Sequence, residues 1–162
     1  MGQRTEKKIA EAEVKSCFPG LEGDEQFSVT SPETSKYNCI AWAYLIENRW
    51  MWPPAGMLAP SLDAVTFWPN ANASDDVSEF IKAFEGKGYR KCDHSEYEEG
   101  FQKIALYVES GTTCCTHAAR QKRDGTWTSK LGEWYDIQHG TPYTIEGDVY
   151  GKVHCIMKRK FP

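Results

Sequence analysis

The chain lacks an apolar stretch of about 18 residues, the length that would indicate a membrane-spanning helix. Its amino terminus, MGQRTEKKIAEAEVKSC, lacks the apolar core that a secretory signal peptide requires. Cysteine is sparse, with six in 162 residues, well below the content of a disulfide-stapled scaffold. We therefore expect a reduced protein that is cytoplasmic at synthesis, with export by a signal-independent route left open.

An excess of positive charge is also missing, since 19 Lys and Arg face 23 Asp and Glu, a net charge of −4. No basic stripe appears along the chain, so a nucleic-acid partner is not expected. Phosphate-binding and zinc-peptidase motifs are absent, as are paired Cys-x-x-Cys ligands. Cys114, Cys115 and His117 crowd together, but strand alternation divides them between two faces. We therefore expect neither a cofactor nor a metal.

What is present is the composition of one globular domain, with 40% hydrophobic and 26% charged residues. Helical periodicity marks residues 4–15, 37–50 and 75–86, and strand alternation marks 102–109, 113–121, 126–132 and 148–160. This order predicts an α+β fold, with amino-terminal helices packed on a carboxy-terminal antiparallel sheet. We expect a terminal helix and loop over 1–26 and a single domain over 27–162.

The helix predicted over 37–50, capped by Thr34 or Ser35, carries Cys39 in its first turn. Free backbone N–H groups and the helix dipole favour a thiolate there, and the same N–H groups could hold an oxyanion. Cys39 is therefore the candidate nucleophile. The alternative is that it is a small buried side chain, as most free cysteines are.

A base for this nucleophile is most plausible at His117, which lies in the middle of a predicted strand beside small Ala118 and Ala119. A purely structural histidine is the alternative. His94 and His154 are expected at the surface. A third group that orients the imidazole is expected at Asp136 or His139.

The turn that follows His117 sets the register of the next strand. If Gly125 takes the left-handed position, Ala119 pairs with Ser129, and Trp127 joins His117 and Ser129 on one side. A two-residue turn would pair Ala119 with Lys130 instead, because a slip of one residue reverses the faces. We favour the first register. The candidate substrate contacts are Asn38, Trp42, Trp127, Ser129 and Lys130.

A cysteine that opens a helix, a histidine on a strand and a later polar residue resemble the order in papain-like enzymes. That group includes papain, the NlpC-type peptidoglycan peptidases and the amidase effectors of type VI secretion. The resemblance implies a papain-like arrangement, Cys39 as nucleophile, His117 as base and a peptide or peptidoglycan-like substrate. The fragments KYNCIAWA, THAARQ, DGTWTSKLG and DIQH also resemble an uncharacterised bacterial domain family. Papain's upstream glutamine and downstream asparagine have no clean match, so Ser129, Asp136 or His139 must take the third role.

Two functions follow from these residues. The first is a cysteine hydrolase, a peptidase or amidase, in which a Cys39 thiolate attacks an amide and His117 transfers the proton. The alternative is a non-catalytic interaction module that docks a partner through the tryptophan- and proline-rich segment 50–70.

Overall fold

The computed structural model describes residues 2–31, 37–46, 49–53, 66–70, 72, 74–131 and 134–161. Much of the segment 50–70 and the predicted caps Thr34 and Ser35 lie outside these residues. Within the described residues, no helix is long and apolar enough to cross a membrane.

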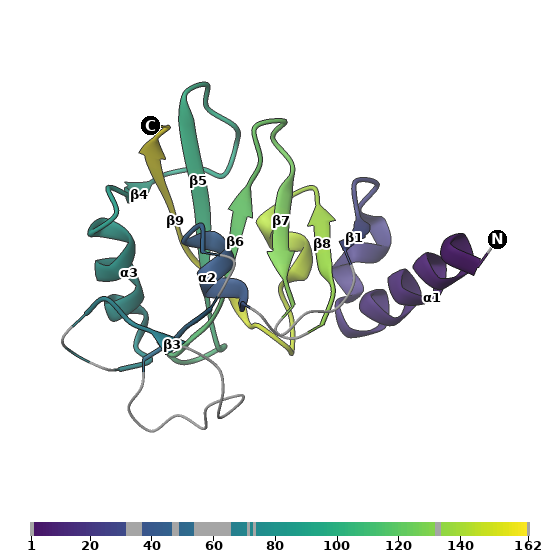
Figure 1. The fold of residues 1–162 in the computed structure, drawn as a ribbon, viewed down its shortest axis with the longest axis horizontal. Helices are drawn as coiled ribbons and strands as arrows, with labels where there is room; N and C mark the ends of the chain where they lie inside the picture. Colours follow the sequence, from purple (N-terminus) through teal and green to yellow (C-terminus); the bar gives the residue numbers. More distant parts are fainter. Residues whose placement is uncertain are drawn as a thin grey trace.

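A seven-stranded sheet forms the centre of the molecule, in the order β1-β8-β7-β6-β5-β9-β4 (Figure 1). Every neighbouring pair in it is antiparallel, which confirms the predicted mixture of helices and antiparallel sheet. A separate parallel pair joins β2 and β3. The strands are β1 (Ser28–Ser31), β2 (Trp50–Met51), β3 (Thr66–Phe67), β4 (Arg90–Cys92), β5 (Phe101–Val108), β6 (Cys115–Gln121), β7 (Trp127–Lys130), β8 (Asp136–His139) and β9 (Lys152–Lys160).

Three α-helices and two 3₁₀ turns accompany the described sheet: α1 (Gly2–Cys17), α2 (Cys39–Ala43), α3 (Val77–Glu85), η1 (Pro19–Gly23) and η2 (Pro142–Ile145). The first and third helices were predicted from periodicity. The cap of α3 is Asp76, whose carboxylate accepts the N–H of Ser78.

The predicted helix over 37–50 is far shorter than its apolar pattern suggested. It ends because Leu45 adopts a left-handed backbone, with φ of 67°. The N–H of Ile46 bonds to the carbonyl of Ala41, and that of Leu45 bonds to Trp42. These two bonds form a Schellman motif, in which the left-handed position is usually glycine. The chain then turns into β2, which periodicity alone did not reveal.

The register of β6 and β7 follows the favoured prediction. Arg120 pairs with Thr128 and Gln121 with Trp127, which aligns Ala119 with Ser129. Gly125 has a φ of 89°, and its N–H bonds to the carbonyl of Lys122. His117 and Ser129 therefore share one face of the sheet.

Two hydrophobic clusters cover the two faces of the sheet. Alternate residues of β5 divide between them: Leu106 faces the cluster under α2 and α3, while Tyr107 faces the cluster with α1 and η2. In Figure 1, α2 crosses the front of the sheet. Val14, Phe18 and Leu21 of the amino-terminal segment are fully part of the second cluster.

Candidate functional site

Cys39 is the first residue of α2, directly after its cap. The side chain of Asn38 accepts the N–H of Ala41 at 3.1 Å, which makes Asn38 the cap in place of Thr34 or Ser35. The same amide exchanges hydrogen bonds with both backbone groups of Met51. The polar atoms of the Asn38 side chain therefore hold the start of α2, where Cys39 lies, against β2.

Cys39 is 6% exposed, and its thiol lies at the start of α2. Burial raises the pKa of this thiol to about 11, against the opposing effect of N–H groups of Ala118, Ile40 and Cys39 itself. The expectation of a resting thiolate is therefore wrong, because loss of solvation outweighs the helix terminus.

The second part of the site is a chain of hydrogen bonds across three neighbouring strands. His117 on β6 places Nε2 at 3.0 Å from the hydroxyl of Ser129 on β7. The same hydroxyl lies 2.9 Å from Nε2 of His139 on β8. His139 Nδ1 in turn lies 2.8 Å from the carbonyl oxygen of Thr141. All three side chains of this relay, His117, Ser129 and His139, are buried.

The carbonyl at the end of this relay determines where its protons lie. A carbonyl only accepts, so His139 carries its proton on Nδ1 and uses Nε2 as an acceptor. Burial lowers the pKa of His139 to about 4 and that of His117 well below 6.5, so both rings are neutral. Ser129 then donates to His139 and accepts from His117 Nε2–H. His117 is left with a lone pair on Nδ1, the atom a base needs.

The Nδ1 atom of His117 is buried and has no hydrogen-bond partner within the described part of the chain. A buried acceptor without a partner is costly and uncommon, and calls for an explanation. The backbone N–H of Ala118, the residue after His117, is one of the groups that lower the pKa of the Cys39 thiol.

The side chains of Cys39 and His117 lie on opposite faces of the sheet. Cys39 packs with Ala118 in the cluster under α2, whereas His117 lies with Tyr107 in the other cluster. The pairs that join β6 to β7 lie near their connecting turn, at Arg120 and Gln121. The amide of Ala118 lies before that paired stretch, so β7 does not pair with it.

Two tyrosines complete the surroundings of His117, and neither was a candidate in the sequence analysis. The ring of Tyr150 is stacked on the imidazole, with centroids 3.9 Å apart and planes at 10°. Tyr107 contacts the imidazole at an angle and donates to the carbonyl of Pro142. The glycine that follows Tyr150 in the fragment VYG is the sequence feature that could have indicated this position. Gly151 has a φ of 78°, and a Cβ there would lie 1.9 Å from the carbonyl oxygen of Val108. Only glycine permits this approach to β5.

Asp136, the other candidate for orienting His117, lies on the opposite side of β8 from His139. Its carboxylate accepts hydrogen bonds from Ser31 and Tyr37 and lies 3.8 Å from the ammonium of Lys130. Lys130 is fully buried and donates to the carbonyl of Trp134. These two residues form a polar cluster on the α2 side of the sheet and do not contact the relay.

The tryptophan candidates are packed in place. Trp42 donates from Nε1 to Thr128, and the guanidinium of Arg120 covers its ring at 3.8 Å. Trp127 is buried in the cluster around Tyr107. His94 and His154 are exposed. Among the described residues, no group of three or more His, Cys, Asp or Glu side chains could hold a metal ion.

These features describe a mixed helix and antiparallel-sheet domain with a thiol at a helix start and a buried histidine relay. The chain belongs to the domain family of unknown function DUF7689, whose model matches residues 28–158. The match confirms the resemblance to an uncharacterised domain family. Neither the curated proteins nor the solved structures contain a match to this chain.

Proposed function

We propose that the protein is a papain-like cysteine hydrolase that cleaves an amide bond through Cys39 and His117. The observation that carries the proposal is the relay from Thr141 through His139 and Ser129. It leaves Nδ1 of His117 as a proton acceptor that has no partner among the described residues, and the next residue, Ala118, supplies a backbone N–H that lowers the pKa of Cys39.

The chemistry follows from the neutral state of both groups. With the thiol pKa near 11 and the imidazole pKa depressed, no ion pair forms in advance. His117 Nδ1 takes the thiol proton as sulfur attacks the carbonyl carbon, and returns it to the leaving amine. Water then hydrolyses the thioester, with His117 as base again. The relay holds the ring orientation, and the N–H groups at the start of α2 stabilise the oxyanion.

Substrate must reach a sulfur that has little exposed surface. Attack therefore requires side chains around the start of α2 to move when substrate binds. The papain-like resemblance suggests a peptide or peptidoglycan-like amide as substrate.

The burial of Cys39 and His117 favours a second candidate function. In that alternative the thiol and imidazole are packing groups of a non-catalytic interaction module. The docking segment would be 50–70, of which Trp52 and Trp68 pack edge-on against Phe80 of α3. Residues 54–65, between these two tryptophans, lie outside the described residues.

The substitution Cys39→Ser separates the two functions. Wild-type protein is incubated with a library of amidated peptides and muropeptide fragments, and cleavage is followed by mass spectrometry. A hydrolase loses turnover in Cys39→Ser while its thermal midpoint changes little. The matched control is Cys115→Ser, a second buried cysteine, which should retain turnover. Retained cleavage in a destabilised Cys39→Ser protein would contradict the proposal.

A further inference from the structure

Positive side chains that are scattered along the sequence meet at one end of the sheet. A cavity of about 360 Å³ is lined by Leu45, Gln102, Arg120, Gln121, Lys122, Arg123, Arg159 and Phe161. A second cavity of about 350 Å³ shares Arg159 and is lined by Lys87, Gly88, Arg90, Phe101, Lys158 and Lys160 as well. In Figure 1 this is the end where β9 and the turn between β6 and β7 lie.

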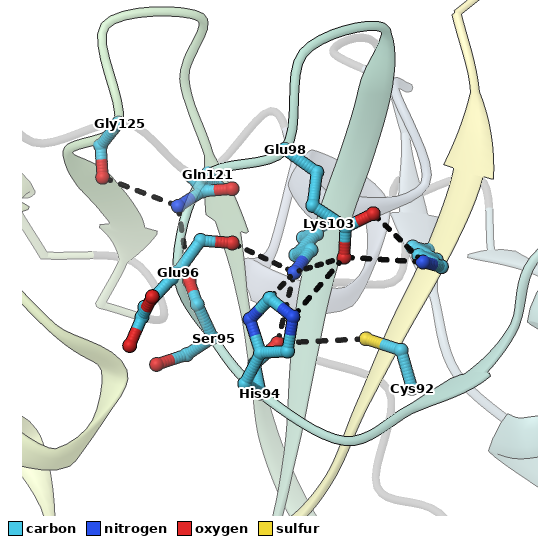
Figure 2. A network of polar contacts seen from close by, with 9 residues as sticks. Cys92, His94, Ser95, Glu96, Glu98, Lys103, Gln121 and Gly125 are labelled. Atoms are coloured by element: carbon cyan, nitrogen blue, oxygen red, sulfur yellow. Dashed lines mark hydrogen bonds and ion pairs between the residues drawn. The ribbon is translucent and has the colours of Figure 1, made fainter.

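The charge of these two cavities is unlike that of the whole chain. Among the described residues that line them, none is Asp or Glu, although the chain carries a net charge of −4. Two acidic side chains nearby offset part of the charge. Glu98 binds Lys158 at 2.8 Å, and Asp124 lies 3.8 Å from Lys122. Figure 2 shows that Glu98 is also held by Lys103, which limits its reach to the cavities.

Arg159 lines both cavities and lies among their positively charged side chains. Its guanidinium donates to the carbonyl of Lys87 and covers the ring of Tyr89 at 5.2 Å. Its Nε–H is buried and has no partner in the described part of the chain. Burial first, and the charge of Arg159 second, lower the pKa of the neighbouring Lys87 ammonium. A bound anion would relieve this repulsion and could satisfy the orphaned donor.

The size of the two cavities and the rings that line them favour a small anion over a nucleic acid. Each is the size of a small-molecule site rather than of a long groove. Their two phenylalanines are covered by cations, Phe161 by Arg123 at 3.9 Å and Phe101 by Lys158 at 4.6 Å. These rings therefore offer no platform for stacking nucleic-acid bases. Several cations around two adjoining cavities suit a ligand with more than one dianionic group.

We propose that these adjoining cavities bind a small polyphosphate-bearing molecule, with Arg159 between its phosphate groups. The inference is independent of the chemistry at Cys39. Leu45 forms the apolar rim of the first cavity and is 42% exposed.

The test is calorimetric titration of the full chain with inorganic tripolyphosphate at about 0.15 M salt. We expect saturable binding that weakens as salt rises. Arg123→Gln and Arg159→Gln should each weaken it by about tenfold or more. Arg123 is exposed on a turn, so its variant should fold even if Arg159→Gln does not. The control Lys152→Gln removes an exposed cation at the other end of β9 and should bind normally.

Comparison ligands complete the experiment. Citrate should bind more weakly than tripolyphosphate, and a single-stranded RNA oligonucleotide should not bind more tightly. Cys39→Ser should bind tripolyphosphate as the wild type does. The inference is overturned if tripolyphosphate does not bind, if Lys152→Gln loses as much affinity as Arg123→Gln, or if the RNA binds more tightly.

Discussion

The ring of Tyr150 lies parallel to the imidazole of His117, with the two centroids 3.9 Å apart. This contact excludes water from one side of the imidazole and restricts its rotation. Tyr150→Leu should lower the free energy of unfolding by about 1–3 kcal/mol, because an aromatic contact is lost and a void forms. Tyr150→Phe keeps the ring and should remain close to wild type. Urea unfolding measures both, and equal losses in the two variants would contradict the role of the stack.

The hydroxyl of Ser129 accepts from His117 and donates to His139. Ser129→Ala removes it and leaves two buried imidazole nitrogens without partners, which should cost about 1–3 kcal/mol. Nitrogen NMR should place the His117 proton on Nε2 in the wild type and show a mixture of tautomers in Ser129→Ala. A wild-type proton on Nδ1 would contradict the proposed base.

The neutral state of the buried histidines predicts how stability depends on pH. The unfolded chain takes up protons on these residues below about pH 6.5, whereas folded His139 resists protonation down to about pH 4. The free energy of unfolding should therefore fall as pH drops from 6.5 to 4, by about 3 kcal/mol for His139 alone.

The carboxylates affect the free energy of unfolding at lower pH than the histidines do. The pKa values of Glu98 and Asp76 are lowered to about 2 by hydrogen bonds, from Lys158 to Glu98 and from Ser78 to Asp76, so their stabilisation is lost only below about pH 4.5. Chemical unfolding between pH 4.5 and 6.5 thus isolates the histidines. His139→Gln should flatten the slope there, while the exposed control His154→Gln should not. An unchanged slope in His139→Gln is the result that contradicts this account.

Leu45 is a non-glycine residue at the left-handed position that ends α2. Leu45→Gly should raise the free energy of unfolding by about 0.5–1 kcal/mol, since it removes the steric cost of that backbone. Leu45→Ala keeps a Cβ and should show no such gain. Thermal and urea unfolding of both variants decide whether the backbone or the exposed side chain matters at this position.

Local sequence signals predicted α1, α3 and the strands β5, β6, β7 and β9 because their periods extend over whole elements. The turn at Gly125 predicted the register that brings Ser129 beside His117. The apolar pattern over 37–50 predicted too long a helix, because a Schellman motif without glycine cannot be recognised from the sequence. Strand β8 also escaped notice, because it is short and its residues are buried on both faces of the sheet.

The candidate site was predicted in part. Cys39, His117, Ser129 and His139 were identified from their residue types and positions. Burial of Cys39 was given only as the alternative to a reactive thiol, and it reverses the expected ionisation of Cys39. The stacking of Tyr150 depends on the close approach of Gly151 to β5, a long-range contact that no local pattern encodes. The gathering of cations around Arg159 likewise arises only when β4, β6 and β9 are brought together.

In the proposed reaction, Cys39 accepts an acyl group and His117 is the base. The most direct measurement is acetyl transfer from p-nitrophenyl acetate to each cysteine, followed by mass spectrometry at neutral pH. We predict acetylation at Cys39 that subsequently hydrolyses, slowed about 100-fold or more in His117→Ala. Acetylation spread evenly over the cysteines, or a Cys39 rate unchanged in His117→Ala, would contradict the account.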